Sequence, residues 1–169
     1  LMQAPKNGFF YVIDRASGEL LGADKFAKAT WASHVDLKTG RPVENPEADW
    51  ANVKEPQIVY PGPIGAHNWQ PMSYSPQTGL VYIPAQQAPA LYAPDNAQVW
   101  KGKGRWTLGT MPIALPETAK ELQGVADLYK GQLVAWDPGD QKAAWTQDYA
   151  TVWTGGTLAT AGGLVFQGT

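Results

Sequence analysis

The sequence predicts an all-β fold, and two observations lead to that class. Short apolar runs alternate with turn signals along most of the chain. The 169 residues also include 18 glycines and 14 prolines, which favour many turns over long helices. Hydrophobic residues make up 44% and charged residues 17%, so the composition is that of a folded domain with a core.

Four hairpins share one pattern: a strand, an Asp or Ser, a turn that contains glycine, and a second strand. The Asp or Ser side chain is expected to accept hydrogen bonds from backbone N–H groups a few residues on. The glycine is expected to take the positive-φ position. The capping residues and turn glycines are Asp14 with Gly18, Asp36 with Gly40, Ser75 with Gly79, and Asp137 with Gly139.

The spacing of these hairpins is uneven, because two longer stretches are inserted between them. Residues 41–66 are polar and rich in proline, and residues 85–115 are irregular, with Gly and Pro at intervals. Similar hairpins that recur with variable insertions indicate a sheet-repeat architecture such as a β-propeller.

One segment has helical character. Residues 116–131, "PETAKELQGVADLYKG", carry Glu117 near the start, leucines at 122 and 128, and Gly131 after the last turn. We therefore expect a single short helix there.

Composition excludes several classes of function. The formal charge is −2 and no basic stripe is present, so nucleic acid is not an expected partner. No apolar run is long enough to span a membrane. The absence of cysteine excludes disulfides, thiolate zinc sites, haem attachment through paired cysteines and cysteine nucleophiles within this stretch. His34 and His67 lack metal-ligand spacing, and nucleotide-binding and serine-hydrolase motifs are missing. A glycosidase-type carboxylate pair stays open, although capping accounts for most carboxylates.

Both ends of the chain suggest a segment of a longer protein. The sequence opens with "LMQAPKNGFFYVIDR", without an initiating Met at position 1, and stops at "GGLVFQGT", in or just after a strand. We expect a fragment.

The stretch 152–169, "VWTGGTLATAGGLVFQGT", is a first candidate for a binding surface. Trp153 precedes Gly155 and Gly156, and two short strands follow, joined at residues 161–163. Glycines at such a place admit either a flat ligand or a second backbone at close range. A tight hairpin at the inner edge of a propeller blade accounts equally well for the small residues.

Two further stretches carry structural signals. In "AWDPGDQKAAW", the spacing of Ala135, Asp137 and Trp145 predicts that the indole lies flat against a neighbouring sheet, with its N–H donated to a backbone carbonyl. In "APKNGFFYVIDR", Lys6 stands at the start of an apolar strand. This cation is either simply solvated or, if the strand start faces a central cavity, available to a ligand.

Four motifs, "APKNGFFYVIDR", "GAHNWQPMSYSP", "AWDP…AAW" and "WTGGTLATAGGLVFQGT", resemble those of the pyrroloquinoline quinone (PQQ) dependent alcohol dehydrogenases. This family includes quinoprotein and quinohaemoprotein enzymes, and the resemblance covers essentially the whole chain. It implies part of an eight-bladed β-propeller, about three blades of four-stranded sheets stapled by tryptophan-docking motifs. The chain would then form a single PQQ-binding domain over residues 1–169.

The resemblance also implies roles for individual residues. Lys6 would lie against the quinone oxygens, where a cation stabilises the negative charge that develops during reduction. Asn68 would donate a hydrogen bond to PQQ. Trp69 would either line the site or pack in the core.

The segment Trp153–Gly155 would contact the cofactor edge. Thr154 stands where relatives often carry Asn, so a side-chain contact at that position is in doubt, whereas a backbone contact is still expected.

Other parts of the expected machinery lie outside this chain. In the family, the catalytic Asp and the calcium ligands precede the position of Lys6, so the chain alone is expected to be inactive. The whole enzyme would be periplasmic and would oxidise a small primary alcohol to an aldehyde. Electrons would pass to a cytochrome c or a quinone. As in the quinohaemoprotein members of the family, the full-length protein would also carry haem c. The competing interpretation is a non-catalytic propeller scaffold that binds a protein partner.

Overall fold

The computed structural model describes residues 1–52, 55–95, 100, 102–104, 109–110 and 117–169. Within these residues the regular structure is almost entirely strand, with one helix, α1 (Ala119–Ala126), and one 3-10 turn (Pro46–Ala48). The predicted all-β class is confirmed. No described helix has the length and apolar character needed to cross a membrane.

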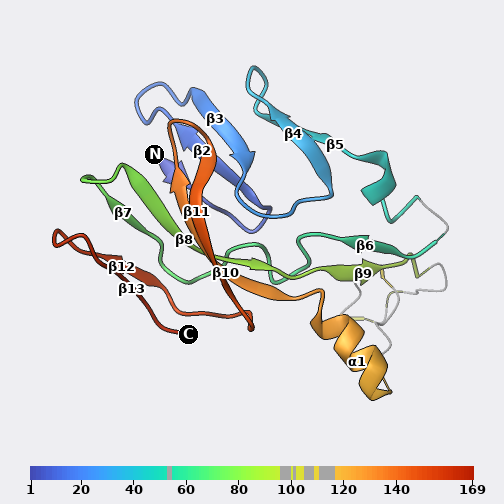
Figure 1. Ribbon diagram of the computed structural model, residues 1–169. Coiled ribbons are helices and arrows are strands. Elements are labelled where there is room, and N and C mark those ends of the chain that lie inside the picture. Colours follow the sequence, from blue (N-terminus) through green and yellow to red (C-terminus); the bar gives the residue numbers. More distant parts are fainter. Residues whose placement is uncertain (53–54, 96–99, 101, 105–108, 111–116) are drawn as a thin grey trace.

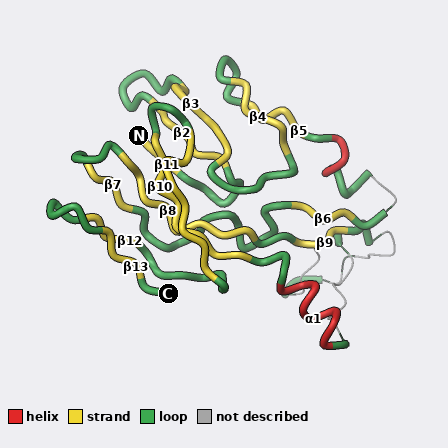
Figure 2. The backbone as a smooth tube through the Cα atoms, in the orientation of Figure 1, coloured by secondary structure: helices red, strands yellow, loops and turns green. Residues whose placement is uncertain are grey.

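The described strands form five antiparallel sheets (Figures 1 and 2). The central sheet has the order β11-β10-β8-β7, a second sheet has the order β1-β2-β3, and three two-stranded sheets pair β4 with β5, β6 with β9, and β12 with β13. The strands are β1 (Met2–Gln3), β2 (Phe9–Ile13), β3 (Leu20–Lys25), β4 (Ala32–Asp36), β5 (Arg41–Glu44), β6 (Gln57–Val59), β7 (Ser73–Ser75), β8 (Leu80–Gln87), β9 (Ala90–Tyr92), β10 (Lys130–Asp137), β11 (Lys142–Tyr149), β12 (Thr157–Ala159) and β13 (Val165–Gln167).

All four predicted hairpins are present, and their aspartates cap the turns. One carboxylate oxygen of Asp14 accepts from the N–H groups of Ala16 and Ser17, at 2.9 and 2.8 Å. Asp36 and Asp137 cap their own turns in the same way. Ser75 differs, because no hydrogen bond from its turn to its side chain is found among the described residues. Its backbone carbonyl accepts from Gly79 N–H at 2.9 Å, as those of Asp14 and Asp36 accept from Gly18 and Gly40.

The positive-φ residue of the fourth turn was predicted wrongly. In the first three turns the residue four positions after the cap has positive φ, and it is glycine each time. Four positions after Asp137 stands Gln141, with φ of 52°, whereas Gly139 does not have positive φ. The Gln141 side chain then accepts from Asp24 N–H at 3.1 Å, which ties this turn to β3.

The two stretches expected to be irregular contain paired strands. Residues 41–66 include β5 and β6, and residues 85–115 include the end of β8 and β9. The pairing of β6 with β9 joins the two stretches to each other, with Ile58 opposite Leu91. Local sequence did not reveal this pairing, because its partners are distant along the chain.

The helix is shorter than predicted. Thr118 caps α1 and forms a capping box with Glu121, whose carboxylate accepts from the Thr118 N–H at 3.1 Å. The helix ends at Ala126, and Lys130 and Gly131 already belong to β10. Pro116 lies outside the described residues.

The two phenylalanines at the start of β2 enter different cores. Both are fully buried. Phe10 packs with Val81, Ile83 and Trp136 of the central sheet. Phe9 packs on the opposite face, with Ala29, Ala32 and Val35 toward β4. The β1-β2-β3 sheet is therefore covered on both faces.

A third core lies on the other face of the central sheet. Tyr82, Leu133 and Ala135 pack there against Ala159 and Val165 of the β12–β13 hairpin. The sheets accordingly stack face to face in the order β4–β5, β1-β2-β3, central sheet, β12–β13, with the two hairpins at opposite sides of the molecule (Figure 1).

The predicted docking tryptophan, Trp145, lies on β11 and is 44% exposed. Its ring contacts Tyr82 of the same sheet, with centroids 5.9 Å apart. The docking role of Trp145 stays a prediction. Trp31 has the bonding pattern expected of such a residue, since its indole N–H donates to the Asn7 carbonyl at 2.8 Å and its ring lies edge-on to Phe9.

Candidate cofactor site

Three of the predicted site residues, Lys6, Asn68 and Trp69, lie in or against one loop, residues 61–70, which we call the site loop. It is held from both sides by backbone bonds. Ala66 N–H donates to the Lys6 carbonyl at 2.9 Å, and Gln86 N–H of β8 donates to the Ala66 carbonyl at 2.8 Å. The loop therefore runs between the residues that precede β2 and the end of β8.

Lys6 and Asn68 meet at neighbouring carbonyls of the site loop. The Lys6 ammonium donates to the Pro63 carbonyl at 3.1 Å, and the Asn68 amide donates to the Ile64 carbonyl at 2.9 Å. The structure thus brings together the two groups that the sequence placed 62 positions apart. Lys6 is exposed and Asn68 is partly buried.

Gly65 makes the approach of Lys6 possible. It has φ of +82°, and a Cβ at this position would lie 2.5 Å from Lys6 Cγ. A larger residue would displace the lysine stem from the site loop.

His67 holds the site loop through a buried imidazole. Its imidazole is 6% exposed, with Nδ1 2.5 Å from the Ala4 carbonyl and Nε2 2.7 Å from the Gln70 carbonyl. The ring therefore ties the chain before β2 to the end of the site loop. This explains why a histidine stands beside Asn68: it is a buried structural residue.

Trp69 points outward. Its side chain is 73% exposed, so it does not pack in a core formed by the described residues of this chain. A flat exposed indole next to Asn68 is compatible with the other alternative, a place along the rim of a site.

Trp153 has a left-handed backbone, with φ of 60°, and its side chain is 48% exposed. Its N–H donates to the Gln86 side-chain oxygen at 3.2 Å. The segment 153–155 is thereby joined to the site loop through one buried amide.

Thr154 and Gly155 are engaged within their own hairpin. The Thr154 hydroxyl, on a residue that is 6% exposed, accepts from the Gln167 amide at 3.0 Å. Gly155 N–H donates to the Gly168 carbonyl at 2.7 Å, and a Cβ on Gly155 would lie 3.1 Å from that oxygen. The close approach at Gly155 is therefore made by a second backbone, as the hairpin interpretation expected.

Gln86 is the residue that sequence reasoning missed. Its side chain is 4% exposed and donates to the carbonyls of Ile64 and Gly65, at 3.4 and 3.0 Å. A signal was present: "LVYIPAQQ" places two adjacent glutamines at the end of an apolar run, and a buried amide needs partners.

The donor set fits an anionic planar quinone. Within the described residues Lys6 donates one hydrogen bond, which leaves further N–H groups of its ammonium for a ligand. Asn68 adds a carboxamide next to this cation, and the exposed indoles of Trp69 and Trp153 offer flat apolar surfaces. Carboxylates and quinone oxygens are suitable acceptors for this combination.

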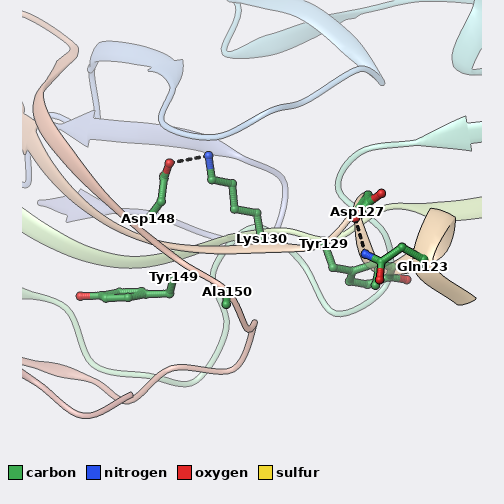
Figure 3. Close-up of a pocket in the computed structure, with 8 residues that line it drawn as sticks. Gln123, Asp127, Tyr129, Lys130, Asp148, Tyr149 and Ala150 are labelled. Atoms are coloured by element: carbon green, nitrogen blue, oxygen red, sulfur yellow. Dashed lines mark hydrogen bonds and ion pairs between the residues drawn. The ribbon is translucent and has the colours of Figure 1, made fainter.

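A separate cavity of about 470 Å³ lies between α1 and the central sheet (Figure 3). Lys130 and Asp148 form an ion pair of 2.5 Å there, and this contact, with a second hydrogen bond from Gln132, lowers the pKa of Asp148. The cavity includes none of the predicted site residues. Among the described residues, no group of three or more His, Asp or Glu side chains is arranged to hold a metal.

No family model matches the chain. The quinohemoprotein alcohol dehydrogenase ADH IIB of Pseudomonas putida is 52% identical over all 169 residues, which correspond to 23% of that protein. A 1-butanol dehydrogenase (cytochrome c) of Thauera butanivorans is 41% identical over the whole chain and 24% of its own length. The chain thus spans about a quarter of the length of these relatives.

Solved structures agree in fold. The quinohemoprotein alcohol dehydrogenase ADHIIG of P. putida superimposes with a TM-score of 0.92 at 48% identity, over 98% of this chain and 25% of that one. A europium-containing methanol dehydrogenase gives a TM-score of 0.75 at 28% identity, over 99% and 28% of the two chains. The propeller-type fold is confirmed, while the number of blades stays a prediction. In sequence and in fold, the chain is homologous to a segment of the quinoprotein and quinohaemoprotein alcohol dehydrogenases.

Proposed function

We propose that the chain forms one part of the PQQ site of an alcohol dehydrogenase that oxidises small primary alcohols to aldehydes. The observation that carries this proposal is the meeting of Lys6 and Asn68 at the adjacent carbonyls of Pro63 and Ile64. The identity of up to 52% to quinohemoprotein alcohol dehydrogenases supports it.

Bound PQQ supplies a two-electron acceptor for the alcohol. Lys6 would contribute a positive charge to the quinone oxygens of bound PQQ, and its bond to the Pro63 carbonyl already orients that charge, so little reorganisation would be needed. The Asn68 carboxamide would orient the same edge of bound PQQ by donating a hydrogen bond as a neutral group. The exposed indoles of Trp69 and Trp153 would line the rim of the site and exclude water from bound PQQ.

The remaining chemistry belongs to other parts of the protein. The chain matches about a quarter of its relatives, and we place the catalytic Asp and the calcium ligands in the remainder. The electron acceptor is a cytochrome c or a quinone, in agreement with the names of relatives that are cytochrome c- or quinone-linked. We further propose a periplasmic location and, in the full-length protein, a haem c domain.

Replacement of Lys6 tests this function. The full protein that carries this chain is reconstituted with PQQ and calcium, and ethanol-dependent dye reduction is measured. Lys6→Ala should lower kcat about a hundredfold, because a charge that stabilises the developing anion is lost. Lys38→Ala, which removes an exposed lysine in the β4–β5 turn, is the matched control and should keep full activity.

Two results would count against the proposal. If the unmodified protein shows no PQQ-dependent oxidation, the scaffold interpretation replaces it. If Lys6→Ala and Lys38→Ala have equal turnover, Lys6 does not belong to the site.

A further inference from the structure

We propose that Gln86 is a positioning residue. It fixes three segments relative to one another: the residues around Lys6, the site loop, and residues 153–155. This inference rests on the proposed function. Gln86 lies on β8, the strand at the centre of the molecule with six consecutive buried residues. Its side chain is 4% exposed, whereas those of Lys6, Trp69 and Trp153 are exposed, so it acts through other residues.

The carboxamide of Gln86 donates to the site loop through its N–H groups and accepts from Trp153 through its oxygen. The N–H groups point to the site loop, at the Ile64 and Gly65 carbonyls, and the oxygen accepts the N–H of Trp153. An amide is the side-chain group that can do both, because it presents two donors and an acceptor at one end.

Each of these contacts adjoins a predicted cofactor contact. The Ile64 carbonyl also accepts from Asn68, and Gly65 is the residue against which Lys6 packs. Trp153 opens the segment expected at the cofactor edge. The three segments come from distant parts of the chain, and within the described residues this single buried side chain bonds to both the site loop and Trp153.

Gln87 provides a matched comparison. It is adjacent on β8 and partly buried, but its amide donates to Gln132 of β10 at 3.1 Å and does not contact the site loop. Substitutions at the two positions therefore remove the same chemical group from the same strand, and only one of them disturbs the site.

The test measures PQQ affinity by fluorescence titration in the full protein, together with amide exchange of the peptide that contains Trp153. Gln86→Met removes the side-chain donor to the Gly65 carbonyl and the acceptor for the Trp153 N–H, and it leaves the Ile64 carbonyl with Asn68 as its donor. PQQ affinity should fall about ten- to a hundredfold. Exchange at Trp153 should become faster. Gln87→Met should change neither measurement.

Gln86→Glu separates the contribution of the hydrogen bonds to the site loop from that of the hydrogen bond to Trp153. A carboxylate still accepts from Trp153 N–H, but it repels the Ile64 and Gly65 carbonyls. PQQ affinity should fall as in Gln86→Met, while exchange at Trp153 stays close to that of the unmodified protein.

The outcomes distinguish this inference from the proposed function. If the unmodified protein does not bind PQQ, both fall. If it binds PQQ and Gln86→Met binds as tightly as Gln87→Met, only the positioning role is overturned. Should Gln86→Met fail to fold, as judged by circular dichroism, Gln86→Asn gives the same comparison, because it withdraws the amide by one methylene.

Discussion

At the scale of single residues, the turn aspartates connect sequence pattern to stability. The backbone N–H of Ser17 lowers the pKa of Asp14, that of Lys38 lowers the pKa of Asp36, and that of Asp140 lowers the pKa of Asp137. In each case a hydrogen bond to the carboxylate favours its charged form in the folded state. All three residues are half-buried.

A group whose pKa is lower in the folded state stabilises the fold above its unfolded pKa, and this contribution is lost as pH falls through the folded value. The free energy of unfolding should therefore decrease on acidification below about pH 4. Replacing the three aspartates by Asn keeps a side-chain oxygen that accepts the turn hydrogen bonds and removes the titrating carboxyl. The free energy of unfolding of this variant should therefore depend less steeply on pH. Urea unfolding between about pH 2.5 and 6 measures this. Parallel curves for the variant and the unmodified protein would contradict the assignment.

At the scale of elements, α1 is held by its first turn. None of its residues is buried, so packing contributes little to it. The capping box of Thr118 and Glu121 satisfies N–H groups that have no partner inside the helix.

Thr118→Ala should therefore loosen the helix by about 1 kcal/mol. The expected result is faster amide exchange across residues 119–126, with little change in global unfolding. Thr118→Ser keeps the hydroxyl and serves as the control. Equal protection in the two variants would show that the cap is not what holds α1.

At the scale of the whole molecule, the stacking of sheets depends on β2. Phe9 and Phe10 belong to separate cores, on opposite faces of one sheet. Each interface should consequently respond to its own phenylalanine.

Phe9→Leu and Phe10→Leu should each cost about 1 to 1.5 kcal/mol, because each leaves part of a close-packed core unfilled. The double variant should lose the sum to within about 0.5 kcal/mol, as for sites that share no partners. Urea unfolding of the three variants gives the comparison. A coupling energy well above that margin would mean that the two cores are not independent.

The sequence predicted features that depend on local chemistry. The pattern of Asp14 and Gly18, an Asp with a glycine four residues later, predicts a turn from local sequence alone, because capping and positive φ need only a few neighbouring residues. Lys6, Asn68 and Trp153 were predicted as site residues from motifs, and their cofactor roles stay predictions. Gln141 shows the limit of the local approach: position within the turn, and not the presence of a glycine, decides which residue takes positive φ.

Long-range features were predicted poorly. The pairing of Ile58 with Leu91 joins two stretches that carry no strand pattern of their own. Gln86 was missed for a related reason, since its partners Gly65 and Trp153 are distant in the chain. The burial that makes its amide important exists only after folding.

The adjacent phenylalanines of β2 have a consequence for strand register. A slip by one residue normally moves apolar side chains from a buried face to the wrong side. At Phe9 and Phe10 such a slip would keep a phenylalanine at one of the two places and bring Tyr11 or Gly8 to the other, so this pair penalises misalignment only in part. The tight turn after Asp14 then shares in selecting the alignment of β2 with β3, and an added residue in that turn should produce a shifted strand more readily than an unfolded one.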